Sequence, residues 1–230
     1  MKILKAVILG DTECGKTSFT TRYTTGNFPD PNFLRTTIGA SFDTKKITTA
    51  SGNDVTLSIW DFGGQEYYHG TFRLFLSNFA VYILLWETDT NKNDVISTEV
   101  REAESEELQH YHYKYWLDNI RHFAPDSPIL IVQNKVDKDQ RQRISTTWID
   151  EYNIFGDHHI SLHEAAKTGT SKYKWSFDTF CNDLSECFEE ILKKNILLSL
   201  ISLDIRYHSR FFVQVGHKFT HAAIGNHIFY

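Results

Sequence analysis

The chain has 230 residues, of which 41% are hydrophobic and 23% are charged, so it is long enough for one α/β domain with a full core. Its formal net charge of −5, from 24 Lys and Arg against 29 Asp and Glu, argues against a general nucleic-acid binder, which needs a basic face. The three cysteines have no metal-ligand spacing and are odd in number, so we expect no disulfide framework and a reducing, cytoplasmic compartment.

The first predicted element is a buried strand at residues 3–9. This apolar run is too short for a secretory signal and leads into a glycine-containing turn instead of a cleavage site. Elsewhere polar residues interrupt every apolar run well before 18 positions, so no transmembrane helix is expected. The chain has neither a glycine at position 2 nor a cysteine near its C-terminus, so we expect no lipid anchor.

A phosphate-binding loop is predicted directly after this strand. Residues 10–17 read G-D-T-E-C-G-K-T and match G-x-x-x-x-G-K-[ST], ahead of a predicted helix at residues 15–25. In such a loop, backbone N–H groups and the helix N-terminus surround phosphates, Lys16 reaches the β- and γ-phosphates, and Thr17 binds Mg²⁺. The predicted phosphate-binding residues are Gly10, Asp11, Thr12, Glu13, Cys14, Gly15, Lys16, Thr17 and Ser18.

The connection between this helix and the next strand holds three further candidates. Thr37 can close over Mg²⁺ and the γ-phosphate, although a threonine before a strand is also an ordinary β-former. Phe28 either stacks near a nucleotide base or belongs to the core, and the sequence favours neither. We interpret Arg35 as a solvated side chain, with an arginine finger supplied in cis as the alternative.

A hairpin follows, with strands predicted at residues 41–49 and 55–60 on either side of the turn sequence S-G-N-D. The second strand ends at Asp61, whose carboxylate can hold Mg²⁺, usually through water. Gly64 allows a backbone N–H to approach the γ-phosphate, and Gln65 is the residue expected to orient the attacking water. A helix is predicted next, at residues 66–76.

The middle of the chain contains a strand predicted at residues 80–86 and a polar, acidic segment at residues 88–113. We interpret this segment as a solvated loop leading into a long helix at residues 97–123, and a partner-binding insertion is the alternative.

Guanine recognition is predicted after the strand at residues 129–133. The carboxylate of Asp137 can accept two hydrogen bonds from guanine, whereas adenine would leave it unpaired, which opposes an ATP-using enzyme. Asn134 would tie the base-binding loops together, and the stem of Lys135 would lie along the base. A weaker signal, Ala165-Ala166-Lys167, offers the backbone N–H of Ala166 to guanine O6.

The last elements are a helix at residues 145–152, a strand at 159–162 and a helix at 175–194. Together the predicted elements describe an α/β P-loop NTPase: a mostly parallel six-stranded sheet with one antiparallel strand and helices on both faces.

Residues 195–230 are predicted to lie outside this domain of residues 1–194. They begin apolar and become aromatic and rich in histidine, and they either continue the last helix or open a second domain. The spacing of the four histidines matches no standard zinc motif, so we interpret them as incidental. They are His208, His217, His221 and His227.

These motifs occur in an order and spacing that resemble the Ras-like small GTPase superfamily over residues 1–194. The phosphate loop and Thr37-Ile38-Gly39 look like Rab proteins. The run from Trp60 to His69 and the Y-W-L-D-N-I sequence at residues 115–120 look more like the Roc domain of Roco proteins. The resemblance implies slow hydrolysis of GTP to GDP, two switch segments read by effector proteins, and activating and exchange proteins as partners; a homodimer is left open.

The sequence therefore predicts a molecular switch in which Lys16, Thr37 and Gln65 are catalytic, and Thr17, Thr37 and Asp61 hold Mg²⁺. A binding module that holds GTP or GDP for assembly and hydrolyses it poorly is the alternative, because the bulky Glu13 lies next to the expected phosphates.

Overall fold

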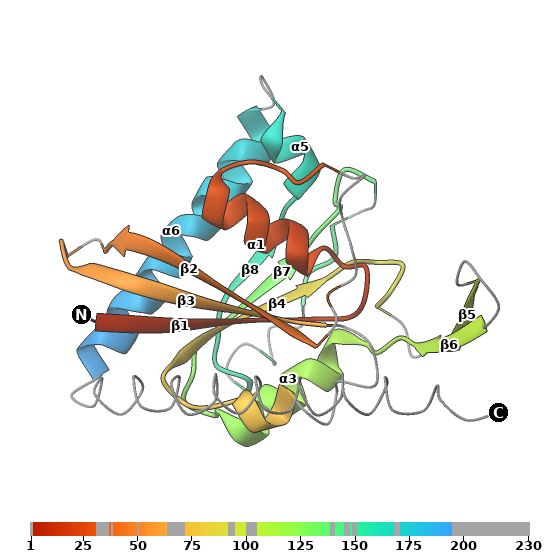
Figure 1. The fold of residues 1–230 in the computed structure, drawn as a ribbon, viewed down its shortest axis with the longest axis horizontal. Coiled ribbons are helices and arrows are strands. Elements are labelled where there is room, and N and C mark those ends of the chain that lie inside the picture. The colour runs from red at the N-terminus through yellow and green to blue at the C-terminus, as the bar shows by residue number, and fades with distance from the viewer. Residues whose placement is uncertain are drawn as a thin grey trace, which may run out of the picture.

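The computed structural model describes residues 2–30, 37, 39–49, 51–63, 72–91, 95–99, 105–138, 141–144, 148, 151–167 and 171–194. Its centre is a six-stranded sheet in the order β2-β3-β1-β4-β7-β8, shown in Figure 1. The strands are β1 Lys2–Leu9, β2 Ala40–Thr48, β3 Asp54–Phe62, β4 Ala80–Trp86, β7 Ile129–Gln133 and β8 Ile154–His159. Only the β2–β3 pair in this sheet is antiparallel, which confirms the predicted hairpin and fold class.

Helices cover both faces of the sheet, as predicted. On one face lie α1 Lys16–Thr25, α5 Leu162–Ala166 and α6 Ser171–Lys194, and on the other lie α3 Tyr113–Phe123 and the 3₁₀ helix η3 Arg73–Phe75 (Figure 1). The strands β4 and β7 read as nearly continuous apolar runs because their alternate side chains enter two separate cores. In β4, for example, Val81 and Ile83 enter one core while Tyr82 and Leu84 enter the other.

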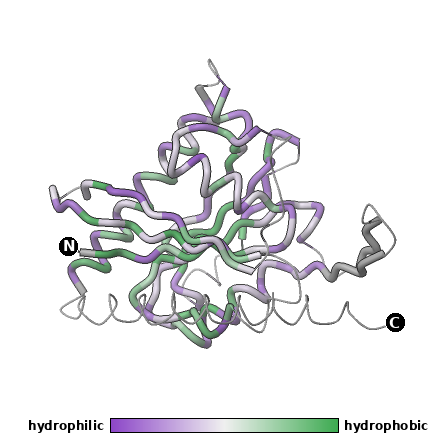
Figure 2. Tube along the Cα trace, viewed as in Figure 1, coloured by the Kyte–Doolittle hydropathy of each residue, from purple (hydrophilic) through white to green (hydrophobic). Residues whose placement is uncertain are grey.

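The hydropathy of the chain follows this layering. Figure 2 shows hydrophobic segments along the central strands and hydrophilic segments in the outer loops. On α3, the buried residues Trp116, Leu117 and Ile120 form one helical face toward the sheet. Among the helices within the described ranges, none is both long and apolar enough to span a lipid bilayer.

The prediction for the last strand was wrong. The strand β8 runs over Ile154–His159. Of the residues predicted as a strand at 159–162, His159 ends β8, Leu162 begins α5, and the two between them form the turn that joins the two elements. The side chain of Ser161 caps α5 by accepting from the backbone N–H of Glu164 at 3.2 Å. Ile160 and Leu162 are apolar because they are buried beside the sheet in this turn, and the edge strand itself is polar.

The long helix predicted at residues 97–123 was also wrong in its first half. Residues Val95–Glu99 form β5 and Ser105–Gln109 form β6, and the two pair antiparallel in a small sheet of their own. The β-branched residues of β5 favour a strand, and the acidic residues lack the apolar spacing of a packed helix. The helix α3 starts only at Tyr113, where the side chain of His112 caps it by accepting from Lys114 N.

The remaining helices differ from their predicted bounds or lie partly outside the described residues. The helix α6 begins at Ser171, earlier than predicted. Of the helix predicted at residues 66–76, only 72–76 are described, and they contain η3. Of that predicted at 145–152, Trp148, Glu151 and Tyr152 are described. Residues 195–230 lie outside the described part of the chain, so the interpretation of this extension stays a prediction.

Candidate functional site

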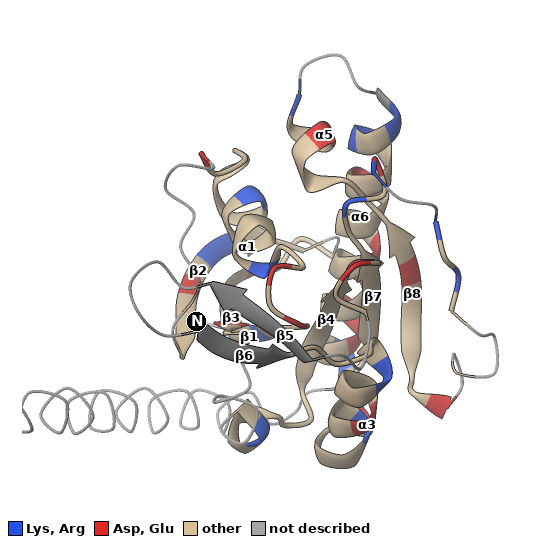
Figure 3. Cartoon of the chain, turned by 90° about the vertical axis from the view of Figure 1, so that its right-hand side faces the viewer, with Lys and Arg blue, Asp and Glu red and all other residues tan. Residues whose placement is uncertain are grey.

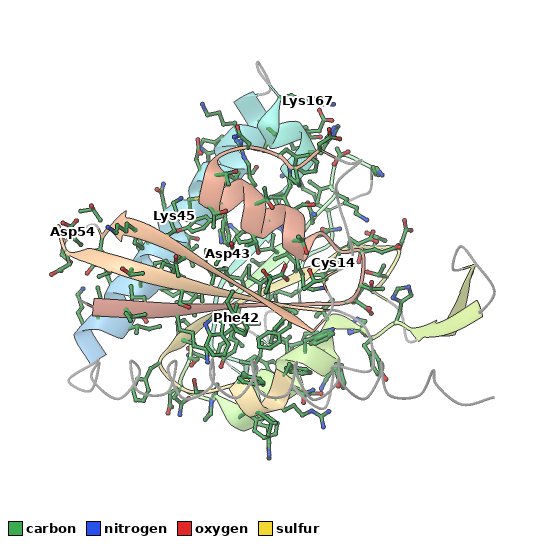
Figure 4. All side chains as sticks on the ribbon, viewed as in Figure 1. Cys14, Phe42, Asp43, Lys45, Asp54 and Lys167 are labelled. Atoms are coloured by element: carbon green, nitrogen blue, oxygen red, sulfur yellow. The ribbon has the colours of Figure 1, made fainter. Side chains whose placement is uncertain are left out.

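The candidate residues gather at the carboxyl edge of the parallel strands. The phosphate loop follows β1, Asp61 is the last residue but one of β3, and Asn134 follows β7. Figure 3 looks onto this edge of the sheet, and Figure 4 labels Cys14 at the start of α1 and Lys167 at the end of α5. In open α/β sheets, ligands bind in the crevice beyond the carboxyl ends of the strands.

The phosphate loop requires glycine at both glycine positions of its motif. Gly10 has φ of 139°, and a Cβ atom there would lie 2.0 Å from the carbonyl oxygen of Leu85. Gly15 has φ of 99°, and a Cβ atom there would lie 2.5 Å from Nδ2 of Asn134. The loop therefore runs too close to β4 and to the residue after β7 for any side chain at these two positions.

Inside the loop, Lys16 is buried and its Nζ donates to the carbonyl oxygen of Asp11 at 2.6 Å. From the first position of α1, the lysine side chain thus reaches back across the loop that precedes this helix. Cys14 is fully buried, and burial raises the pKa of its thiol to about 11, so at neutral pH it is a packed thiol and not a thiolate.

The three predicted metal ligands converge next to this loop. The hydroxyl of Thr17 donates to Oδ2 of Asp61 at 2.9 Å, and the hydroxyls of Thr17 and Thr37 lie 2.8 Å apart. The backbone N–H of Gly63 donates to the carbonyl of Gly39 at 2.8 Å, which joins the segments that carry Thr37 and Asp61.

Asp61 is 1% exposed, and its Oδ1 has no hydrogen-bond partner among the residues that the structure describes. Burial raises the pKa of this carboxyl, and the nearby charge of Lys16 opposes the rise. Carboxylate and hydroxyl oxygens are suitable ligands for a hard divalent cation, so the buried free oxygen fits Mg²⁺. The described residues contain no cluster of three or more His, Cys, Asp or Glu able to hold a metal.

Asn134 joins two of the loops at this edge. Its Nδ2 donates to the carbonyl of Cys14 at 3.0 Å, and its Oδ1 accepts from the backbone N–H of Leu162 at 3.2 Å. The side chain is 5% exposed, so both bonds form in a largely dry environment. Asn134 therefore connects the phosphate loop to the start of α5, in the tying role that its motif predicts.

The other base-site candidates lie around this connection. Asp137 is exposed, Ala165 is buried, and Ala166 and Lys167 end α5. Phe28 is half-buried against the core that contains α1, and its ring meets His163 of α5 edge-on at 5.4 Å between centroids. The structure thus brings Phe28 to α5, a position compatible with either of its two interpretations.

Lys135 has a partner that the sequence did not indicate. Its backbone has φ of 60°, and its Nζ donates to Oε1 of Glu87 at 3.3 Å. Glu87 is 2% exposed, follows β4 directly, and also accepts from the backbone N–H of Asp89 at 3.2 Å. The only signal for Glu87 in the sequence was a carboxylate at the end of an apolar strand.

Three predicted residues lie outside the described part of the chain, namely Arg35, Gly64 and Gln65. Their roles stay predictions.

Comparison with known proteins places the chain in a family. The family model described as "Ras of Complex, Roc, domain of DAPkinase" matches residues 5–137. Rab-26 of Drosophila melanogaster is 30% identical over 167 residues, which are 72% of this chain and 38% of that protein. Rab-30 of Homo sapiens is 27% identical over 195 residues, which are 84% of this chain and 86% of that protein.

Among solved structures, the chain is similar to Roco2 RocCORdC of Methanosarcina barkeri bound to GDP. The TM-score is 0.58 and the identity 26%, and the match covers 80% of this chain and 50% of that one. The chain thus spans half or less of the Rab-26 and Roco2 chains that it matches. Since the family model covers more than half of the 230 residues and the fold agrees, the chain belongs to the Roc family within the Ras-like superfamily.

Proposed function

We propose that the chain is a cytoplasmic guanine-nucleotide switch that binds Mg²⁺ and hydrolyses GTP to GDP and phosphate. The observation that carries this proposal is the meeting of Thr17, Thr37 and Asp61 beside the phosphate loop, where one buried oxygen of Asp61 lacks a partner among the described residues. The Roco2 structure, which is bound to GDP, supports the same ligand class.

In this proposal the loop residues bind the phosphates and the threonines and Asp61 hold the metal. Backbone N–H groups between Gly10 and Ser18 face the phosphates, and Lys16 exchanges its bond to the Asp11 carbonyl for the β- and γ-phosphates. When bound, Mg²⁺ would neutralise phosphate charge. Gln65 orients the attacking water, and loss of the γ-phosphate frees Thr37 and Gly64, so both switch segments relax.

Base selectivity is assigned to the loops that Asn134 joins. The exposed carboxylate of Asp137 accepts from two guanine donors, and the N–H of Ala166 donates to guanine O6. Lys135, held by Glu87, covers the base with its stem. Effector, activating and exchange proteins would read the switch segments.

The alternative function, a binding module with little hydrolysis, is favoured by one observation. Glu13 is exposed in the phosphate loop with φ of 62°, a conformation that costs a non-glycine residue energy. A carboxylate at this position repels the γ-phosphate and would weaken the state in which hydrolysis starts.

The test is single-turnover phosphate release from metal-stripped protein loaded with GTP or ATP, before and after Mg²⁺ is added. Release from GTP alone, and only with Mg²⁺, supports the switch. Tight GTP retention without release supports the binding module. Failure to bind either nucleotide overturns both the switch hypothesis and the binding-module hypothesis.

Two carboxylate variants make the same test specific. Asp137→Asn should lose most of the preference for GTP over ATP, because the amide no longer offers two acceptors to guanine. Asp126→Asn, an exposed residue remote from the loops at the carboxyl edge, should behave as the unmodified protein does.

A further inference from the structure

The side chain of Asp11 makes contacts that the proposed function does not use. This residue is the second of the phosphate loop, yet it is 3% exposed. Its Oδ2 accepts from the backbone N–H of Tyr111 at 2.5 Å, and its Oδ1 accepts from the backbone N–H of Thr12 at 2.6 Å. Nδ1 of His110 lies 3.2 Å from the same Oδ1, and His110 is itself 4% exposed.

These contacts compensate the buried carboxylate of Asp11, which lies in a loop proposed to bind phosphates. Burial raises the pKa of Asp11, while the amide of Tyr111 and the neighbouring His110 oppose the rise. Nδ1 of His110 faces Oδ1 at 3.2 Å without hydrogen-bond alignment, so a ring N–H there acts on the carboxylate through its dipole. A carboxylate without such partners would add its repulsion to every phosphate entering the loop.

Asp11 also connects these partners to the lysine of the loop. Its backbone carbonyl accepts from Nζ of Lys16, while its carboxylate is held by residues 110 and 111. The N–H of Thr12, in the same peptide unit, donates to Oδ1 of Asp11, so the carboxylate still holds this unit when Lys16 turns to the phosphates. Holding this unit also holds the direction of the N–H groups that follow it in the loop.

The residues that contact the Asp11 carboxylate from outside the loop follow β6, the second strand of the small sheet. His110 directly follows β6, and two residues later His112 caps α3. The backbone N–H of Tyr113 donates to Oδ1 of Asn91 at 2.8 Å, which closes the two ends of this insertion on each other. The rings of Tyr111 and Tyr115 lie 4.5 Å apart, which adds a contact to α3.

We propose that His110 is a positioning residue for the phosphate loop: it holds the carboxylate of Asp11 and thereby slows the dissociation of guanine nucleotide. The slower dissociation of nucleotide rests on the proposed function, whereas the positioning of the phosphate loop by His110 does not. His110 touches neither the metal ligands nor the base site in the described contacts, so it acts through Asp11.

The test compares His110→Leu with His110→Asn, two side chains of similar size. Asparagine carries an N–H donor as many bonds from Cα as Nδ1 of histidine, and leucine carries none. Dissociation of a fluorescent GDP analogue should be about tenfold faster for His110→Leu and within about threefold of the unmodified protein for His110→Asn. The control His122→Leu removes an exposed histidine of α3 and should leave the rate unchanged.

A double-mutant cycle separates positioning from a general loss of structure. In an Asp11→Asn background, His110→Leu should accelerate dissociation by less than about threefold, because the charge that it compensates is gone. An equal effect of His110→Leu in both backgrounds, or equal rates for the Leu and Asn variants, overturns the proposal.

Amide hydrogen exchange across residues 11–16 gives a readout that needs no nucleotide. Exchange should be faster in His110→Leu than in His110→Asn, and equal exchange contradicts the positioning role. If the unmodified protein held no GDP, the proposed function would fall, and this exchange difference would still decide whether His110 positions the loop.

Discussion

Lys5 carries a charge into the interior on the face of the sheet that α3 covers. It is 3% exposed, its Nζ donates to the carbonyl of Phe75 at 2.7 Å, and the same atom lies 4.0 Å from the ring centroid of Trp60. The ammonium group therefore binds η3 to β1 and β3. A buried lysine is tolerated because these partners replace its lost hydration.

Replacing Lys5 by methionine should lower the free energy of unfolding by about 1–3 kcal/mol, measured by denaturant titration. The apolar stem is kept, whereas the Phe75 carbonyl loses its donor. Lys46→Met, at an exposed position of β2, should change stability by less than about 0.5 kcal/mol. Equal effects of the two variants would show that the Lys5 contacts contribute little.

Gln65→Leu should slow single-turnover GTP hydrolysis by roughly 10–100-fold while GTP affinity changes little. The reason is that the glutamine is proposed to place the attacking water and not to bind the phosphates in the ground state. Parallel measurement of turnover and of nucleotide dissociation checks this prediction. Unchanged turnover would remove Gln65 from the mechanism.

At the scale of elements, α6 contributes a row of buried apolar residues to the core on its face of the sheet. Its buried apolar residues recur every three or four positions: Phe177, Phe180, Leu184, Cys187, Phe188 and Ile191. The same helix exposes 69% of Trp175. Burial on this helix therefore follows its face and not the size or apolar character of the residue.

Phe188→Ala should cost about 3–5 kcal/mol of unfolding free energy, because the residue is fully buried and its loss leaves a cavity. Trp175→Ala on the same helix should cost less than about 1 kcal/mol despite the larger side chain removed. Denaturation curves of the two variants give the comparison, and a larger loss for Trp175 would contradict the packing described.

The contact between β8 and α6 makes stability depend on pH. Nε2 of His158 lies 3.2 Å from Oδ2 of Asp183, and the His158 ring meets Phe180 edge-on. Burial lowers the pKa of His158 below 6.5, against the opposing charges of Asp183 and Asp157, and the neighbouring His159 lowers it further. Below the unfolded pKa the unfolded chain binds more protons than the folded chain, so this contribution to stability is lost as pH falls.

His158→Gln should therefore reduce the drop in unfolding midpoint between pH 7.5 and pH 5.5, because glutamine does not take up a proton. Thermal unfolding at the two pH values measures the drop. His122→Gln, in an exposed position, should show the same drop as the unmodified protein. An unchanged drop in His158→Gln would assign the pH dependence to other groups.

At the scale of the whole molecule, the two cores that flank the sheet draw their buried members from residues 4–191. The site residues lie within the same span, from Gly10 to Lys167. A fragment of residues 1–194 should therefore unfold in one cooperative transition and retain GDP as the full chain does, since it contains both cores. Calorimetry and GDP dissociation test this, and a fragment that fails to fold would make residues 195–230 part of the domain.

The sequence by itself determined the fold class and the motif residues of the candidate site. Their signals are local: a glycine-lysine-threonine pattern between a strand and a helix, an acidic residue at a strand end, and Asn134 after an apolar run. The strands β4 and β7 were recognisable because each is buried on both faces and reads as a nearly continuous apolar run.

Only the tertiary structure decided how these residues are supported. The pairing of Asp11 with His110 and of Glu87 with Lys135 joins residues 99 and 48 positions apart, and no local spacing encodes such contacts. The strand β8 was misplaced because an edge strand needs few apolar residues, whereas the buried turn after it needs them. Periodicity reports whether a residue is buried, and only the packing of distant segments determines which residues it is buried against.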